Sequence, residues 1–84
     1  MERVVKLDDW KNLFDGNHIY IYTTDGKKFV FNKVLFSIYN ERYVLFYNER
    51  YSLHVYCVEK IISTGNNIQI IIDNGRIICL QVLK

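Results

Sequence analysis

Short runs of alternating apolar and polar residues start after the first 17 residues and continue to the end of the chain. In the first run, Ile19 and Ile21 alternate with tyrosines, and this period of two predicts a β-strand. The segment Thr24-Asp25-Gly26-Lys27 follows, and its Asp-Gly pair supplies the positive φ angles of a type I′ hairpin turn. The return strand extends over residues 28–39, a length at which strands of small barrels bend sharply and serve two sheets. We place the bend at Asn32-Lys33.

One pentapeptide occurs twice in the middle of the chain. Tyr39-Asn40-Glu41-Arg42-Tyr43 recurs without change, eight residues later, as Tyr47-Asn48-Glu49-Arg50-Tyr51. The Asn-Glu-Arg segment is predicted to form a tight turn, because asparagine tolerates turn geometry and its side chain bonds the nearby backbone. The two turns then flank a short strand over residues 43–47, so they lie at opposite ends of the sheet.

The last third of the chain continues the alternation of strands and turns. The pattern predicts, in order, a strand over 51–58, a bend at Glu59-Lys60, a loop over 63–67, a strand over 68–72, an Asp73-Asn74-Gly75 hairpin turn and a strand over 76–83. The last strand is apolar on both faces. That is typical of a strand that is covered on both sides, or of an edge that pairs with another chain.

The N-terminal segment has a helical pattern instead. The first seven residues are interpreted as a short strand or an extended arm. Trp10 and Phe14 then lie four residues apart, on one face of a helix. Asp8 or Asp9 is suited to cap the helix N-terminus, and Gly16 to end the helix in the left-handed conformation. We expect one helix over residues 9–15, which must dock its Trp10 face because so short a helix is unstable alone.

These elements predict a single, mostly β domain over residues 1–84. An N-terminal arm and short helix (1–17) precede a five- to six-stranded antiparallel meander (18–84), which forms a small barrel or a strongly curved sheet. A helix followed by a meander is similar to the order of elements in the Sm/Lsm family. After Asp25-Gly26 the first motif of that family has a glycine and a later acidic-x-x-Met-Asn run, whereas residues 29–34 here read Phe-Val-Phe-Asn-Lys-Val. The similarity is one of architecture, and no family is assigned on it.

The composition favours a binding role. Half of the 84 residues are hydrophobic and 15% are aromatic, which is more apolar surface than one small core encloses, and an exposed apolar patch usually marks a contact site. The net charge is only +2, with charges interspersed, so there is no strong basic footprint for nucleic acid. No apolar run approaches the roughly 20 residues of a membrane span. We therefore expect a partner, and no membrane.

Residue usage also indicates a setting. The chain has no alanine or proline and is rich in Ile, Asn, Lys and Tyr, residues with AT-rich codons. We therefore expect an AT-rich source, such as a low-GC bacterium, its phage or another mobile element. Two cysteines and no cleavable signal peptide predict a location in a reducing cytoplasm.

The titratable residues form no catalytic or metal-binding pattern. His54 and Cys57 lie three apart on one predicted strand and so face opposite sides, whereas zinc sites use paired ligands at short spacing. The same spacing argues against a Cys–His nucleophile. Glu41 and Glu49, at opposite ends of the meander, are too far apart for glycosidase chemistry. We expect no enzyme, no catalytic residue, no metal and no cofactor, with Cys57 and Cys79 as buried free thiols.

The tyrosines and two arginines carry the functional hypothesis. Roughly half of the tyrosines are expected to serve only sheet packing, but Tyr and Arg are also enriched at interface hot spots. The predicted partner-binding residues are Tyr39, Arg42, Tyr43, Tyr47, Arg50 and Tyr51. The leading hypothesis is a non-catalytic protein-binding module. In the cytoplasm of a bacterium or infected host cell it would act as a phage or mobile-element accessory protein that inhibits or modulates a host protein.

Two alternatives remain open. The first is a small β-barrel that binds single-stranded RNA or DNA by tyrosine stacking and arginine contacts; the low net charge makes a protein partner the favoured one. The second is a self-assembling structural domain, with a homodimer formed through the strand over residues 76–83.

Overall fold

A computed structural model describes residues 2–73 and 75–83 of the chain, and in these residues it has one helix and nine strands. The elements, in chain order, are β1 (Glu2–Val5), α1 (Leu7–Phe14), β2 (His18–Tyr22), β3 (Lys28–Phe31), β4 (Leu35–Asn40), β5 (Tyr43–Tyr47), β6 (Ser52–Val55), β7 (Val58–Thr64), β8 (Asn67–Ile72) and β9 (Ile77–Leu83). The prediction of a mostly β, antiparallel fold with one short helix is confirmed. The expected five to six strands are instead nine in the described residues, because the segments over 28–39 and 51–58 are each divided and residues 2–5 also form a strand.

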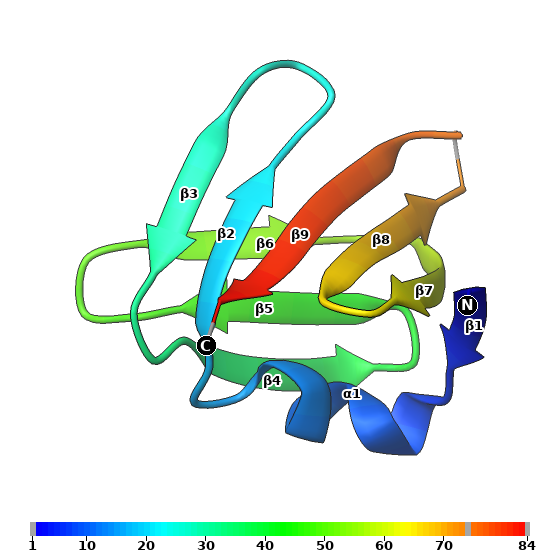
Figure 1. Cartoon of the computed structure of the whole chain (residues 1–84), viewed down its shortest axis with the longest axis horizontal. Coiled ribbons are helices and arrows are strands. Elements are labelled where there is room, and N and C mark those ends of the chain that lie inside the picture. The colour runs from blue at the N-terminus through cyan, green and yellow to red at the C-terminus, as the bar shows by residue number, and fades with distance from the viewer. Residues whose placement is uncertain (1, 74, 84) are drawn as a thin grey trace.

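The strands form two sheets whose strands cross at a steep angle (Figure 1). The larger sheet has the order β1-β7-β8-β9-β2-β3, the smaller one β4-β5-β6, and all neighbours are antiparallel. Among the described residues the hydrogen-bonded ladder stays divided between these two sheets, so a closed barrel is not found.

The chain passes between the sheets at two corners. The first, between β3 and β4, lies at Lys33, whose φ of 56° is left-handed, so the predicted bend at Asn32-Lys33 is confirmed. The second corner is at Cys57, with φ 59°, and it divides the predicted strand 51–58 into β6 and the start of β7. The prediction of a single strand over residues 51–58 is therefore wrong. The bend expected at Glu59-Lys60 is instead an irregularity in pairing between β7 and β8, which lies between Val58 and Lys60.

The helix begins and ends earlier than its pattern predicts. Lys6 is the N-cap and makes no side-chain cap bond, so the prediction of a cap at Asp8 or Asp9 is wrong. Both aspartates lie inside the first turn, where the helix dipole favours a negative charge. Gly16 has φ 79°, as expected of a residue that follows a helix end.

The turns follow from local backbone chemistry, with one correction. In the β2–β3 loop, Thr23 N–H donates to Lys27 O (2.9 Å) and Gly26 N–H to Thr23 O (3.1 Å). Positive φ falls on Gly26 and not on Asp25, so the turn is not type I′. The repeated turns are confirmed: Asn40 Oδ1 accepts from Arg42 N–H, and Asn48 Oδ1 from Arg50 N–H, both at 2.8 Å. The predicted loop over 63–67 narrows to a turn at Gly65-Asn66, because β7 continues to Thr64 and β8 starts at Asn67.

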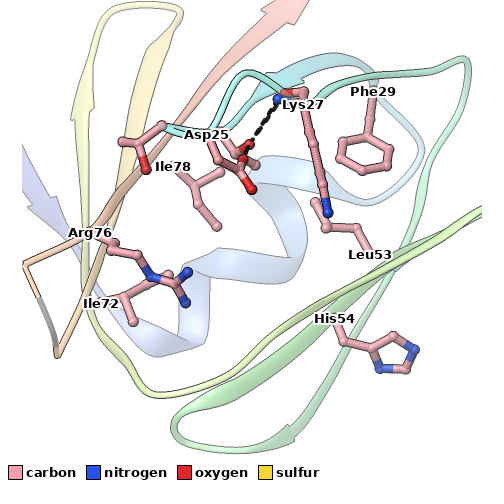
Figure 2. Close-up of a pocket in the computed structure, with 10 residues that line it drawn as sticks. Asp25, Lys27, Phe29, Leu53, His54, Ile72, Arg76 and Ile78 are labelled. Carbon is pink, nitrogen blue, oxygen red and sulfur yellow. Dashed lines mark hydrogen bonds between the residues drawn. The ribbon is translucent and has the colours of Figure 1, made fainter.

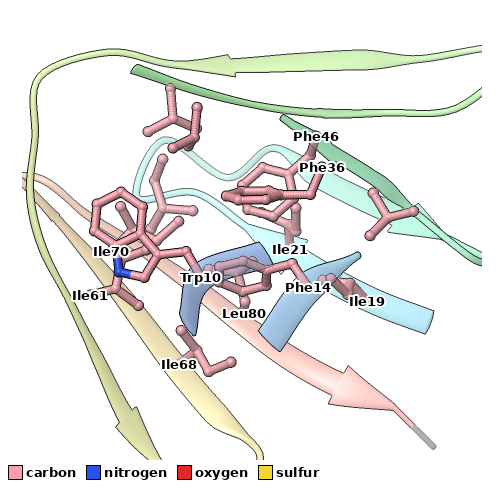
Figure 3. Close-up of a cluster of buried hydrophobic side chains, with 14 of the residues drawn as sticks. Trp10, Phe14, Ile19, Ile21, Phe36, Phe46, Ile61, Ile68, Ile70 and Leu80 are labelled. Atoms are coloured by element: carbon pink, nitrogen blue, oxygen red, sulfur yellow. The ribbon is translucent and has the colours of Figure 1, made fainter. Parts of the chain in front are cut away.

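The core lies between the inner faces of the two sheets, and α1 packs beside β4 (Figure 1). Phe14 of α1 meets Phe36 and Phe46 of the smaller sheet with ring centroids 5.0 Å apart (Figure 3). The larger sheet contributes branched side chains at every second position, which are at most 1% exposed: Ile19, Ile21, Ile61, Ile68, Ile70 and Leu80. Burying a side chain of this size contributes about 1.5–3 kcal/mol relative to leaving it exposed.

Trp10 ties the N-terminal strand to this core. Its ring is buried and its Nε1–H donates to Val5 O at 3.0 Å.

The C-terminal strand β9 lies inside the larger sheet, between β8 and β2, and is therefore not an edge. Asp73 and Gly75 of the predicted hairpin turn are described, whereas Asn74 lies outside the described residues.

Candidate functional site

The outer face of the smaller sheet carries most of the tyrosines of the middle third. In β5, Val44 and Phe46 point into the core, so the alternation turns Tyr43, Leu45 and Tyr47 outward. Tyr39 at the end of β4 and Tyr56 just after β6 are 60% and 58% exposed. This outer face, formed by β4, β5 and β6, is therefore an aromatic surface open to solvent.

Three tyrosine rings are stacked side by side on this face. The Tyr43 ring lies between those of Tyr39 and Tyr56, with centroids 4.9 Å and 4.5 Å apart and interplanar angles of 23° and 15°. His54 extends the set, with its ring 5.9 Å from Tyr43 and 6.2 Å from Tyr56. We call these four side chains (Tyr39, Tyr43, His54 and Tyr56) the aromatic stack. Near-parallel rings at these separations stabilise one another beyond their buried area by about 0.5–1.5 kcal/mol per pair.

A hydrogen bond orders the centre of the aromatic stack. The Tyr43 hydroxyl and His54 Nδ1 are 2.6 Å apart. Partial burial raises the pKa of the Tyr43 hydroxyl above its ordinary value, and the neighbouring Tyr56 and Tyr39 hydroxyls raise it further. Tyr43 therefore stays neutral, and its hydroxyl keeps its proton across the physiological range.

Arg42 lies beside this end of the sheet and is held in place. Its Nε–H donates to Val58 O at 3.4 Å, its guanidinium pairs with the Asp73 carboxylate, and its backbone carbonyl accepts from Val58 N–H at 2.9 Å. The Arg42 side chain is still 53% exposed. It lines an open recess together with Tyr43 and Tyr56. A cation fixed in this way adjoins the aromatic stack without losing its access to solvent.

The second repeated turn lies at the other end of β5. Tyr47 pairs with Leu35 on β4 and Ser52 on β6, and Arg50 and Tyr51 line a second recess near the β3–β4 corner. Tyr43 and Tyr47 are four residues apart along β5, which corresponds to about 13 Å at the usual rise per residue. The six predicted partner-binding residues therefore fall into two groups at opposite ends of one sheet.

Sequence reasoning assigned two members of the aromatic stack no role. It used His54 only to argue against a zinc site and a Cys–His nucleophile, and it did not name Tyr56 among the binding residues. The signal for their orientation was present, because Ser52, His54 and Tyr56 alternate with the buried Val55. What was missing was the pairing of β6 with β5, which puts His54 opposite Leu45 and next to the Tyr43 ring.

The thiols differ from expectation. Cys57 is exposed and Cys79 is half-buried, so the prediction that both are buried is wrong. The cause is the corner at Cys57, which turns its side chain away from the core face that Val55 occupies.

Within residues 2–73 and 75–83, no three His, Cys, Asp or Glu side chains lie close enough together to hold a metal ion. In the same part of the chain, no helix has the length and apolar character needed to cross a membrane.

No protein family, curated protein or solved structure matches this chain. The site must therefore be interpreted from its own chemistry.

Proposed function

We propose that this protein is a non-catalytic module that binds a protein partner through the outer face of the β4-β5-β6 sheet. The aromatic stack carries the proposal, because it is a stacked, half-exposed aromatic surface with an arginine in an ion pair beside it. Tyr and Arg are enriched at interface hot spots. A stack that is ordered before binding also loses less side-chain entropy when the partner arrives.

Two observations favour a protein over a nucleic acid. Both flat sides of Tyr43 face other rings, so a base could stack only on the outer sides of the end rings, such as Tyr39. Arg42, which shares a recess with Tyr43 and Tyr56, is already paired with Asp73, and each turn also carries a glutamate, Glu41 or Glu49. Phosphate binding needs several free cations, and affinity then falls steeply as salt rises.

The test compares capture of partners by three tagged chains from cells that make the protein. The face variant carries Tyr39→Ala and Tyr56→Ala, the two most exposed tyrosines of the aromatic stack. The matched control carries Tyr22→Ala, an exposed tyrosine of the larger sheet. We expect the wild type and the control to retain one common protein, and the face variant to lose it at least tenfold at a temperature at which all three chains are folded. The loss of two stacked pairs should lower the stability of the face variant by about 1–3 kcal/mol, so folding is checked by circular dichroism under the capture conditions. Equal recovery by all three chains would show that this face is not the site.

The nucleic-acid alternative has its own test. Binding of the wild type to labelled single-stranded RNA and DNA would be measured at about 50 and 200 mM salt, the range over which phosphate-mediated affinity changes most. Our proposal predicts no binding at the lower salt. Tight binding that weakens steeply with salt would replace the protein partner by a nucleic acid.

A narrower form of the proposal gives the setting: a phage or mobile-element protein that occupies a surface of a host protein in the cytoplasm and inhibits it. The small size and a composition rich in residues that have AT-rich codons support it. Adding the purified chain to the captured partner should then reduce that partner's activity at a stoichiometric ratio.

Self-assembly through residues 76–83 is the less favoured alternative, because strand pairing there would displace β8 or β2. Light scattering over a concentration series tests it.

A further inference from the structure

A further concave site lies where the β2–β3 and β8–β9 hairpins meet β6, with His54 of the aromatic stack at its border. It is a pocket of about 250 Å³ between these three segments (Figure 2). Its lining residues come from the first hairpin (Thr23, Thr24, Asp25, Lys27, Phe29), from β6 (Leu53, His54) and from the second hairpin (Ile72, Arg76, Ile78). The pocket exists because β3 and β6 each pair on one side only, which leaves the two sheets apart at this end.

The floor of the pocket is apolar. Ile72 and Ile78 are only 6% and 9% exposed, and Phe29 and Leu53 are partly buried against the same core. An engineered cavity of about 150 Å³ lined by such side chains stays dry and binds benzene. The volume here therefore accommodates one aromatic ring or branched aliphatic group, with room left for a small polar head.

The mouth of the pocket carries charge of both signs, with cations in excess. Lys27 and Arg76 extend toward the same space from opposite walls (Figure 2). Among the described residues neither of them forms an ion pair. The Asp25 carboxylate also lines the pocket, but it accepts a hydrogen bond from the Thr23 hydroxyl, which in turn accepts from Lys27 N–H at 3.2 Å. The three ionised side chains leave one net positive charge over an apolar floor.

We propose that this pocket binds a carboxylate attached to a single apolar group. The apolar group would contact Phe29, Leu53, Ile72 and Ile78, and the carboxylate would lie between Lys27 and Arg76. Arginine suits this role because its planar fork matches a carboxylate, and lysine adds a second positive charge. Two sources share this chemistry: a free small carboxylic acid, or the C-terminal residue of a protein. His54 borders both this pocket and the proposed partner face, and the other residues that line the pocket lie outside the aromatic stack.

The test uses phenylacetate as the probe, titrated into the isotope-labelled chain and followed by the methyl NMR signals of Leu53, Ile72 and Ile78. We expect saturable shifts at those methyls with a Kd of about 1 mM or tighter, given the small size of the probe. Phenylacetamide, the neutral isostere, should bind at least tenfold more weakly. Lys27→Gln and Arg76→Gln should each weaken phenylacetate binding by about tenfold. This factor corresponds to the low end of the free energies of hydrogen bonds to charged groups.

Two further variants sharpen the test. Asp25→Asn should tighten phenylacetate binding, because it removes the negative charge at the mouth, and Lys60→Gln on β7 should leave binding unchanged. A short peptide that ends in phenylalanine, compared with its C-terminal amide, distinguishes the sources. If the peptide acid binds at least tenfold better than its amide while phenylacetate fails, the site takes a protein C-terminus.

Other results would overturn the proposal. It is wrong if neither acid binds at 20 mM, a concentration about twentyfold above the expected Kd. Equal binding of acids and amides would also overturn it, as would wild-type affinity in both Lys27→Gln and Arg76→Gln. Because these substitutions lie outside the aromatic stack, such results would leave the proposed partner face untouched.

Discussion

The two corners between the sheets hold ordinary residues in a conformation that favours glycine, and this allows a quantitative test of the fold. Lys33 and Cys57 have φ angles of 56° and 59°. The left-handed conformation costs an L-residue about 1–2 kcal/mol. Replacing Lys33 with glycine removes that cost from the folded state. The greater backbone freedom of glycine also stabilises the unfolded state, by about 0.5–1 kcal/mol. Because Lys33 is exposed, its side chain contributes little, and we expect Lys33→Gly to raise the free energy of unfolding by about 0.5–1 kcal/mol.

The assay is urea unfolding followed by Trp10 fluorescence, together with a thermal melt. Trp10 is a suitable probe because its ring is only 5% exposed in the folded chain. A change of 1 kcal/mol moves Tm by about 4–8 °C in a domain of this size, so Lys33→Gly should raise Tm by about 2–8 °C. The urea dependence should keep its slope, because the surface exposed on unfolding does not change.

The control makes the same chemical change where the backbone is extended. Lys28 is also exposed but lies in β3, opposite Tyr22, and its φ is not positive. Lys28→Gly should therefore lower the free energy of unfolding by about 0.5–1 kcal/mol. If Lys33→Gly destabilises the protein as much as Lys28→Gly does, the first corner is not held in the left-handed conformation and the reasoning is refuted.

Three further predictions concern the core, the N-terminal strand and the aromatic stack. Phe46→Ala should lower the free energy of unfolding by about 3–5 kcal/mol, measured in urea, because the ring is fully buried; a loss below about 1 kcal/mol would contradict the packing. Trp10→Phe should cost about 1–3 kcal/mol and speed amide exchange in β1, because it leaves the buried Val5 carbonyl without its donor; unchanged exchange would mean that this bond does not hold the strand. In an absorbance titration Tyr43 should ionise above the ordinary tyrosine pKa, and Tyr56→Ala should lower that pKa. Because the pKa of Tyr43 is raised on folding, neutral Tyr43 contributes to the free energy of unfolding below the unfolded pKa. That contribution is lost as pH rises through the folded pKa.

Much of the local structure could be predicted, because it depends on neighbours in the chain. The repeated turns form around the side-chain oxygens of Asn40 and Asn48, which bond the backbone two residues later. The period of two in the first strand predicted that Ile19 and Ile21 share one face, and both are fully buried. The corner at Lys33 could be located because the predicted strand was too long to stay straight.

The division of residues 51–58 was not predictable in the same way. Its alternation continues through Tyr56 and Cys57 without a glycine or proline to mark the corner. The break occurs because β6 pairs with β5 while β7 pairs with β8 in the other sheet, so one segment serves two sets of neighbours. Such a requirement comes from segments distant in sequence and leaves no local signal.

By itself, then, the sequence determined a mostly β domain, most of its turns and the buried face of its first long strand, because these depend on backbone preferences and a period of two. Only the tertiary structure decided that His54 and Tyr56 complete a stack around Tyr43, while Tyr47 and Tyr51 lie at the far end of the same sheet. It also decided that β9 is an interior strand and that two hairpins enclose a pocket with β6. The physical reason is that strand order and register are set by which distant segments can bury their apolar faces together.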